Sequence, residues 1–300
     1  MRVLITGATG FIGRALLRAA PPEWDVVAVA RDGRPAAWSG AEPAMWVQAD
    51  LREAGFERRL PRHVDAVAHL AQARTQSAFP DNARELFDLN LLATARLLEY
   101  ARAGADRFVL ASTGTVYRQS TEPLSEDDPI DCTSFYAASK RSAELIVRPY
   151  SELFSCNVLR IFTVYGDGQE DRLISRLVAR VRAGQPVTVQ GRRGLLLSPV
   201  HVDDVAAALV ATIGGETLGG PFEITNVGGP DALGIREVTE ILGRVMGREP
   251  RFESAGTQEP GGFVADIAKL TRMLPIAPPR AFETGATQSF SASVLLREGA

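Results

Sequence analysis

The 300-residue chain is 45% hydrophobic and 23% charged, and it carries a net charge of -3. This length suffices for a full-sized hydrophobic core in one large domain or two modest ones. Nucleic-acid binding favours a strongly basic face, which a net charge this close to zero gives no reason to expect. We therefore expect no nucleic-acid partner.

The cysteines, histidines and hydropathy pattern exclude further classes of protein. Cys132 and Cys156 are the two cysteines and fit a reducing cytoplasm, while the three histidines are too scattered to predict a metal site. The N-terminus has no basic segment followed by an apolar one, and no apolar run approaches the roughly 20 residues that span a bilayer. We therefore expect a cytoplasmic protein with no signal peptide, no membrane span and no metal.

The first half of the chain alternates short apolar runs with helical patterns. Helices are predicted at residues 11–20 and 82–103 and within residues 134–154. Six strands are predicted, at residues 2–6, 25–30, 45–48, 65–70, 107–111 and 157–162. Strands separated by helices indicate βαβ units and a parallel sheet covered on both faces. The predicted fold is therefore α/β, a Rossmann-type doubly wound parallel sheet that binds ligands at the carboxyl ends of its strands.

The pattern loosens after about Gly166. Helices are predicted at residues 172–183, 203–213, 235–246 and 266–274, and short strands at residues 187–189 and 222–225. The last 25 or so residues are rich in Pro, Gly, Ser and Thr, and we expect part of them to be mobile. We predict a Rossmann domain over residues 1–165, to which residues 195–228 return, and a smaller C-terminal α/β lobe over residues 166–300.

A glycine-rich loop, TGATGFIG at residues 6–13, follows the first strand and opens the first helix. Glycine permits the tight turn and lets the backbone approach a pyrophosphate, to which the helix N-terminus offers free N–H groups. The alternative is a glycine-rich turn without a ligand, which the strand–loop–helix context disfavours. We predict a dinucleotide site formed by Gly7, Thr9, Gly10, Phe11, Ile12 and Gly13.

The end of the second strand bears on the choice of dinucleotide. Ala30 occupies the place where an acidic residue would bond the ribose 2′-hydroxyl of NAD, and Arg31 and Asp32 follow it. A guanidinium matches phosphate geometry through paired donors, so Arg31 favours NADP(H). In the alternative, Arg31 is a solvated surface charge and Asp32 reaches the ribose, which allows NAD.

A Y-x-x-x-K pattern, Tyr136 to Lys140, lies on a predicted helix. Residues four apart share one helix face, and an ammonium at that range stabilises a phenolate. Tyr136 is thereby predicted as an acid/base and Lys140 as its supporting cation, which could also donate to the cofactor ribose. The motif alone occurs often by chance, but its combination with the glycine loop makes chance a poor explanation.

These motifs together resemble the extended branch of the short-chain dehydrogenase/reductase superfamily, the NAD(P)-dependent epimerase/dehydratase family. The loop spacing, Phe11 and the chain length point to that branch. Three further stretches resemble its S-S/T-x-x-V-Y, R-x-x-N-x-Y-G and V-H-V-x-D-x-A signatures, at residues 112–117, 160–166 and 200–206. The resemblance covers most of the chain and implies an enzyme with a small-molecule substrate.

The resemblance also implies roles for single residues. Thr113 takes the place of the hydroxyl that holds the substrate oxygen beside Tyr136, with Ser112 as the second candidate; capping of the strand end is the alternative for both. The residues assigned to the cofactor also include Arg31, Asp32, Tyr136 and Lys140. Further positions assigned to the cofactor are Asp50 and Leu51 near the adenine, Leu70 and Ala71 after His69, Asn90 in the long helix, and Phe162.

Two departures from the family bear on the substrate. Thr163 stands where the family has a substrate-contacting asparagine, and Leu197 stands where nucleotide-sugar members have an arginine that grips the pyrophosphate. Arg192 is the nearest arginine that could substitute, so Arg192 and Thr163 join Ser112 and Thr113 as the predicted substrate-binding residues. A pyrophosphate without a guanidinium partner binds weakly.

Three hypotheses follow for the function. The first is an NAD(P)-dependent epimerase, dehydratase or ketoreductase acting on a sugar, with a nucleotide sugar as the expected substrate. The second is an NADPH-dependent reductase of a non-sugar carbonyl or lactol, favoured by Thr163 and Leu197. The third is a non-catalytic dinucleotide sensor, against which Thr113, Tyr136 and Lys140 all argue. The resemblance also implies a possible homodimer through the helices at residues 82–103 and 134–154.

Overall fold

The main sheet has seven parallel strands in the order β11-β6-β5-β4-β1-β2-β3. The protein is seen here as a computed structural model that describes residues 1–36, 38, 43, 45–73, 79–215 and 219–291. The strands are β1 Arg2–Thr6, β2 Asp25–Ala30, β3 Met45–Gln48, β4 Ala66–His69, β5 Arg107–Thr113, β6 Ser155–Ile161 and β11 Phe222–Val227. This order confirms the predicted Rossmann-type α/β fold.

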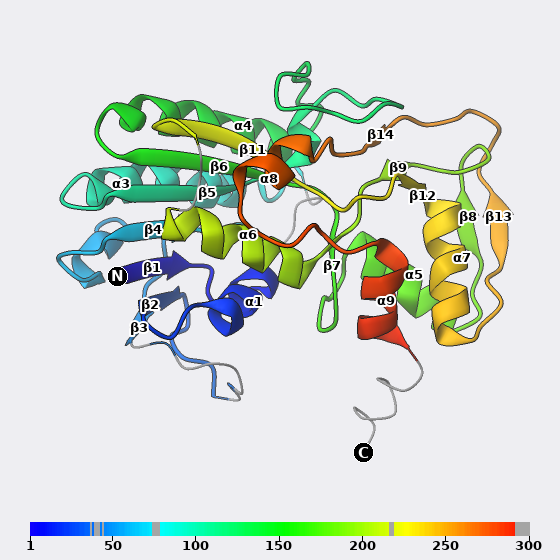
Figure 1. Cartoon of the computed structure of the whole chain (residues 1–300), viewed down its shortest axis with the longest axis horizontal. Coiled ribbons are helices and arrows are strands. Elements are labelled where there is room, and N and C mark those ends of the chain that lie inside the picture. Colours follow the sequence, from blue (N-terminus) through cyan, green and yellow to red (C-terminus); the bar gives the residue numbers. More distant parts are fainter. Residues whose placement is uncertain (37, 39–42, 44, 74–78, 216–218, 292–300) are drawn as a thin grey trace.

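Helices cover both faces of this sheet (Figure 1). Successive residues of a strand point to opposite faces, so Val3 and Ile5 pack in one hydrophobic cluster and Leu4 in another. The first cluster lies under α1 Phe11–Ala19 and α6 Val202–Gly214, and the second under α3 Ala93–Ala101 and α4 Phe135–Val147. The strands therefore carry side chains that are buried on both sides, as their continuous apolar character predicts.

The helix predicted at residues 82–103 is built of three segments. A π-helical turn, η2 Asp88–Leu92, separates α2 Ala83–Phe87 from α3. Such turns inside α-helices occur frequently at functional sites. The following predicted helix is α4, which continues into the 3₁₀ segment η4 Arg148–Glu152.

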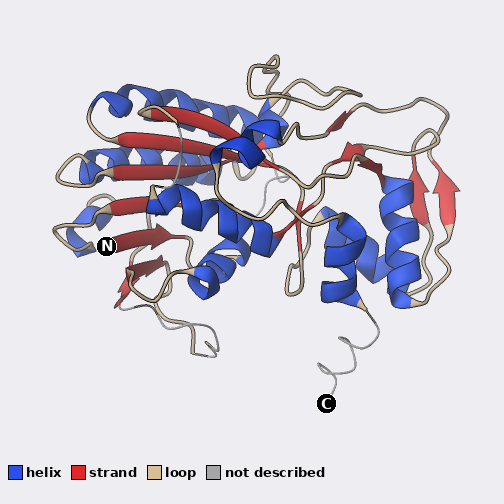
Figure 2. Ribbon diagram, in the orientation of Figure 1, coloured by secondary structure: helices blue, strands red, loops and turns tan. Residues whose placement is uncertain are grey.

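The second half of the chain adds a smaller body of helices and short strands (Figure 2). Its own hydrophobic cluster joins α5 Leu173–Arg182, α7 Ile235–Met246 and α9 Phe282–Phe290. Two small sheets lie beside them, β8 Val187–Val189 with β13 Phe252–Ser254, and β9 Leu196–Leu197 between β12 Leu233–Gly234 and β14 Gly262–Phe263. A third pair is β7 Val164–Tyr165 with β10 Val200–His201.

Three segments of the second half, β11, α6 and α8, pack on the Rossmann domain. β11 extends the sheet beyond β6, and α6 packs against α1. α8 Ala268–Met273 lies against β11, where the Lys269 ammonium donates to the Ile224 carbonyl at 2.6 Å. The remaining short elements are η1 Phe56–Arg59 and η3 Gly114–Val116.

The last described residues form a helix that the sequence pattern does not predict. Residues 282–290 form α9, which Arg280 and Phe282 fix to the rest of the chain. The Arg280 guanidinium makes an ion pair with Asp204 at 2.9 Å, and the Phe282 amide donates to the Asp231 carboxylate at 2.6 Å. Residues 292–300 lie outside the described part of the chain.

Candidate active site

The glycine loop packs directly on the backbone that follows β4. Gly7 has φ +68°, and a Cβ there would stand 2.7 Å from the Ala71 nitrogen. A Cβ on Gly13 would stand 2.2 Å from the Gly7 carbonyl oxygen, so neither position has room for a side chain. The Gly10 amide closes the turn by donating to the Gly7 carbonyl at 2.9 Å. The loop therefore packs tightly on its neighbours, and the exposed Gly10 leaves backbone accessible at the start of α1.

The N-terminus of α1 suits an anionic group. Gly10 is its N-cap in an extended conformation, no side chain caps the helix, and its first turn holds no acidic residue. Free N–H groups and the positive end of the helix dipole therefore remain for a pyrophosphate. The Phe11 ring lies against Gly166, and Ile12 packs on the hydrophobic core. These residues fit a dinucleotide on the loop.

The residues expected around the adenosine lie at the ends of β2 and β3. The Arg31 guanidinium is 3.5 Å from the Asp32 carboxylate, whose side chain is 81% exposed. Arg52 donates side-chain hydrogen bonds to both carboxylate oxygens of Asp50 and holds the pKa of that carboxyl below its usual range. The charge of Arg31 acts in the same direction. Two guanidinium groups, each paired with a carboxylate, therefore lie at the ends of β2 and β3.

The end of β4 lies between the glycine loop and α4. The Thr6 hydroxyl lies 2.7 Å from His69 Nδ1 and accepts from the Ala71 amide at 3.3 Å. Complete burial, with a smaller effect of the Lys140 charge, lowers the pKa of His69 to about 3. His69 is therefore neutral at working pH and holds the chain at Leu70 and Ala71 in place.

Tyr136 and Lys140 come from the first two turns of α4. The Ser134 hydroxyl caps this helix by accepting from the Ala137 amide at 3.1 Å. The Tyr136 hydroxyl donates to Gln72 Oε1 at 3.1 Å, and the Lys140 ammonium donates to the Ala111 carbonyl of β5 at 2.9 Å. Burial lowers the pKa of Lys140 to about 8. Both side chains thus point to the ends of β4 and β5.

The two hydroxyl residues at the end of β5 differ. Thr113 stays at the edge of the sheet, where its hydroxyl accepts from the Thr115 amide at 3.2 Å. This is the strand-end cap that the sequence offers as the alternative role, and the Thr115 hydroxyl lies 3.1 Å from the same oxygen. The Ser112 hydroxyl instead donates to the Glu144 carboxylate inside the protein. The Ser112 hydroxyl is therefore engaged inside the protein, whereas the Thr113 hydroxyl bonds only its neighbour Thr115 among the described residues.

Glu144 of α4 and Arg160 of β6 form a buried ion pair between the helix and the sheet. Their closest atoms are 2.8 Å apart, and their side chains are 1% and 2% exposed. Arg160 also donates to the Tyr117 hydroxyl at 2.7 Å, and that hydroxyl donates to Asn226 of β11 at 2.8 Å. The pair therefore ties α4 to the sheet one turn after Lys140. The sequence shows Glu144 four residues beyond Lys140, but nothing in the sequence pairs it with Arg160.

Asn90 lies on the π-helical turn η2 and supports α4. Its side-chain amide donates to the Ser139 hydroxyl at 2.9 Å, and that hydroxyl donates to the Tyr136 carbonyl at 2.8 Å. Its Oδ1 atom is buried and has no hydrogen-bond partner among the described residues. Asn90 therefore holds the helix that carries Tyr136.

Phe162 lies over Gly114, since a Cβ on that glycine would meet its ring at 2.8 Å.

The model of the NAD-dependent epimerase/dehydratase family matches residues 3–228. The chain belongs to this family. Its members that resemble the chain are enzymes. The chain is 32% identical to the UDP-glucuronate 4-epimerase of Thermodesulfobacterium geofontis over 230 residues, or 74% of this chain and 70% of that enzyme. The predicted family is confirmed.

Two further relatives match almost the whole chain. The dTDP-4-dehydro-6-deoxy-D-allose reductase of Streptomyces bikiniensis is 28% identical over 308 residues, covering 94% of this chain and 93% of that enzyme. The solved structure of MoeE5 in complex with UDP-glucose and NAD is 30% identical, covers all of both chains and superposes with a TM-score of 0.84. The family and its fold therefore extend through the smaller lobe.

The residues expected at the substrate end make few side-chain hydrogen bonds within the described chain. The Thr163 carbonyl accepts from the Val200 amide at 2.9 Å, and no described residue bonds its hydroxyl. Leu197 is buried on β9, between Leu233 and Phe263 of the neighbouring strands. Arg192 is exposed, and no described residue pairs with its guanidinium. Thr163 and Arg192 are thus available to a ligand, whereas Leu197 is a core residue.

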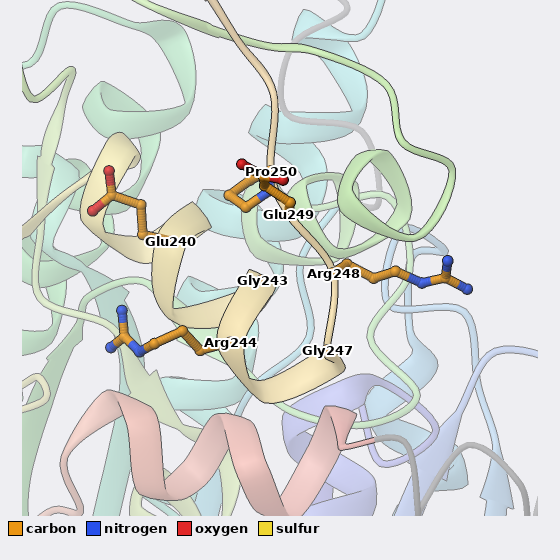
Figure 3. A pocket seen from close by; sticks show the side chains of 7 residues that line it. All are labelled: Glu240, Gly243, Arg244, Gly247, Arg248, Glu249 and Pro250. Carbon is orange, nitrogen blue, oxygen red and sulfur yellow. The ribbon is translucent and has the colours of Figure 1, made fainter.

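Other features of the described chain lie away from this site. A surface hollow of about 510 Å³ borders the end of α7, where Arg244 and Arg248 point apart from each other (Figure 3). None of the predicted site residues lines it. Within the described residues, no cluster of three or more His, Cys, Asp or Glu side chains has metal-binding geometry. No described helix is both long and apolar enough for a membrane span.

Proposed function

We propose that the protein transfers hydride at a sugar carbon of a nucleotide sugar, with Tyr136 as acid/base and a nicotinamide dinucleotide on the glycine loop. The observation that carries the proposal is the meeting of Tyr136 and Lys140 with the glycine loop at the ends of β4 and β5. The names of the relatives support the substrate class, since they include a UDP-glucuronate epimerase and a dTDP-sugar reductase.

The dinucleotide, when bound, supplies or accepts the hydride; the side chains move the proton. In the direction of reduction, the Tyr136 hydroxyl gives its proton to the carbonyl oxygen as that oxygen gains negative charge, and in oxidation the phenolate takes it back. The Lys140 ammonium stabilises the phenolate by its charge. Thr113 holds the same substrate oxygen with its hydroxyl, and the backbone of Gly7 to Gly13 orients the pyrophosphate.

We propose NADP(H) as the dinucleotide and net reduction as the reaction. Arg31 and Arg52 provide two guanidinium groups at the end of the second and third strands, which suits a 2′-phosphate. A second candidate is epimerisation with NAD, favoured by the NAD in the MoeE5 complex and by the epimerase among the relatives. In that case Asp32 would bond the ribose.

The Arg31→Ala variant separates the two dinucleotides. We expect its Kd for NADPH to rise about tenfold, because one charge-assisted contact to phosphate is lost, and its Kd for NADH to stay within twofold. Calorimetric titration with both dinucleotides measures the effect. Equal changes for both would contradict the 2′-phosphate role, and NAD that copurifies would favour the epimerase.

A substrate panel tests the reaction. UDP-glucose, UDP-glucuronic acid and a dTDP-4-dehydro-6-deoxyhexose are each incubated with the protein and dinucleotide, and the products are separated by chromatography. Reduction of the dehydro sugar with loss of NADPH supports the reductase, and a C4 epimer without net redox change supports the epimerase. Turnover of simple ketones, with none of the panel, would favour the non-sugar reductase.

We also propose a homodimer through α2, α3 and α4, as the family resemblance implies. Two large apolar side chains on these helices, Phe87 and Leu145, are 43% and 53% exposed in the single chain. Sedimentation of the protein and of its Leu145→Glu variant tests the proposal. We expect a dimer for the first and a monomer for the second, and a monomer for both would contradict it.

A further inference from the structure

Gln72 lies beside the Tyr136 hydroxyl and has no part in the residue roles assigned so far. It is the third residue after β4, and its Oε1 atom accepts the Tyr136 hydroxyl hydrogen at 3.1 Å. The side chain is half-buried. The sequence offers one signal for it, a long polar side chain directly after the stretch His69-Leu70-Ala71.

The backbone that carries Gln72 is held from two sides. The Ala71 amide donates to the Thr6 hydroxyl at 3.3 Å, and the Gly7 backbone packs so closely on Ala71 that no Cβ would fit between them. Because its neighbour cannot shift, the carboxamide of Gln72 extends from a fixed point. Its contact with Tyr136 joins the glycine loop to α4.

The carboxamide has hydrogen-bonding capacity to spare. Its oxygen is an acceptor and its nitrogen carries two donors, and within the described chain it bonds no group besides the Tyr136 hydroxyl. The Lys140 ammonium, by contrast, is bonded to the Ala111 carbonyl. Gln72 is thus a neutral group with free donors next to the oxygen that is to gain and lose a proton.

A carboxamide can serve both forms of a phenol. It accepts from the neutral hydroxyl through Oε1, and after a half-turn of the amide it donates to the phenolate through Nε2. A hydrogen bond to an ionised acceptor is roughly twice as strong as one between neutral groups, so the net effect favours the phenolate. The half-turn moves no charge through the protein and costs only a side-chain rotation.

We infer that Gln72 is a further residue of the reaction site, which orients the Tyr136 hydroxyl through Oε1 and stabilises its phenolate through Nε2. The inference rests on the proposed role of Tyr136. It assigns the second donor of the amide to the substrate oxygen that shares the proton with Tyr136. A glutamate at this position would place a negative charge beside the phenolate and oppose its formation.

The test uses Gln72→Met, which keeps the size of the side chain, and Gln72→Glu, which keeps its shape and adds a charge. The ultraviolet difference titration of each protein, taken against the same protein with Tyr136→Phe, follows the Tyr136 phenol and needs no substrate. We expect its midpoint to rise by about 0.5–1 pH in Gln72→Met, since one charge-assisted hydrogen bond is lost, and further in Gln72→Glu.

Turnover of the active member of the substrate panel gives the second measurement. We expect kcat/KM at neutral pH to fall about 3–10-fold in Gln72→Met and more in Gln72→Glu, with the pH profile displaced upward. Gln185→Ala, a change of an exposed amide between α5 and β8, is the matched control and should leave both measurements unchanged. Thermal unfolding of each variant shows that the fold is intact.

The outcomes separate this inference from the proposed function. Full turnover by Tyr136→Phe would overturn the role of Tyr136 and, with it, that of Gln72. Loss of turnover in Tyr136→Phe, together with wild-type titration and kcat/KM in both Gln72 variants, would overturn the Gln72 inference alone. A downward shift of the phenol midpoint in Gln72→Met would likewise contradict it.

Discussion

The two ends of the candidate site are built differently. At the dinucleotide end, Gly7 and Gly13 meet neighbouring backbone so closely that no side chain fits. At the expected substrate end, no described residue bonds the Thr163 hydroxyl or the Arg192 guanidinium. The first end is therefore fixed by backbone packing, and the second by the choice of side chains.

This difference explains where the chain departs from its family. A change in the glycine loop would shift β4 and α1, whereas Leu197 can replace an arginine while β9 still pairs with β12 and β14. Leu197 is itself a core residue, so its side chain serves the packing of the smaller lobe. We expect the dinucleotide end to indicate the reaction class and the substrate end to indicate which molecule is transformed.

The largest expected effect is on Lys140. We predict that Lys140→Met lowers kcat/KM by about 100–10,000-fold, because the phenolate of Tyr136 loses its cation in a buried site. Burial lowers the pKa of Lys140 to about 8, so the ammonium is present below that pH and lost above it. Wild-type activity should therefore decline as pH rises through about 8, which a pH–rate profile measures. A profile that keeps rising to pH 10 would contradict the role of the ammonium, as ~10.4 is the ordinary pKa of lysine.

The next effect concerns the buried ion pair that ties α4 to the sheet. Glu144→Gln leaves the Arg160 guanidinium buried without a carboxylate, and we predict a loss of about 3–5 kcal/mol in the free energy of unfolding. Arg141→Ala is the control, since Arg141 contacts the same carboxylate from a half-buried position and should cost less than about 1 kcal/mol. Urea unfolding measures both. An equal loss in the free energy of unfolding for both variants would contradict the explanation that burial of the Arg160 charge sets the effect.

The glycine loop is tested by a single methyl group. Gly13→Ala places a Cβ 2.2 Å from the Gly7 carbonyl oxygen, so the loop must open, and we predict that the dinucleotide Kd rises at least about 30-fold. Gly220→Ala is the matched control, since its Cβ would meet nothing nearer than 4.0 Å. Fluorescence titration with NADPH checks both variants. Normal binding by Gly13→Ala would contradict the packing account of this end.

The smallest expected effect is at the substrate end. The Arg192 side chain is exposed and no described residue pairs with it, so Arg192→Ala should change the free energy of unfolding by less than about 0.5 kcal/mol. If Arg192 grips a substrate phosphate, KM for the active nucleotide sugar rises about tenfold while kcat stays near its normal value. An unchanged KM would remove Arg192 from the substrate site.

Six of the seven sheet strands could be predicted as sheet strands from short apolar runs that alternate with helical patterns. β11 is expected from sequence only as a short strand, since polar residues interrupt it. The two-residue strands β7, β9, β10, β12 and β14 could not be predicted, since they are too short for any periodic signal and depend on pairing with other segments. Helix α9 was missed for a similar reason. Its position depends on the ion pair between Arg280 and Asp204, which are 76 residues apart.

The site residues also differ in whether a local sequence pattern predicts them. Tyr136, Lys140 and the loop glycines carry local patterns whose spacing has a physical meaning in a helix or a turn. Glu144, Arg160 and Gln72 act through partners that only the folded chain brings near, so their sequence neighbours say little about them. Ser112 shows the converse, since its motif position suggests substrate while its hydroxyl turns to Glu144.

The account is tested most directly by Tyr136→Phe, measured for binding and turnover in the same preparation. Calorimetry gives the Kd of NADPH. Chromatography of the products follows turnover of the three nucleotide sugars, and reduced-nicotinamide absorbance also follows reduction of the dehydro sugar. We predict a Kd within twofold of the wild type and turnover at least about 100-fold lower, because the phenyl ring keeps the packing and loses the proton. Turnover at the wild-type rate, or binding of neither NADPH nor NADH by the wild type, would contradict the proposed site.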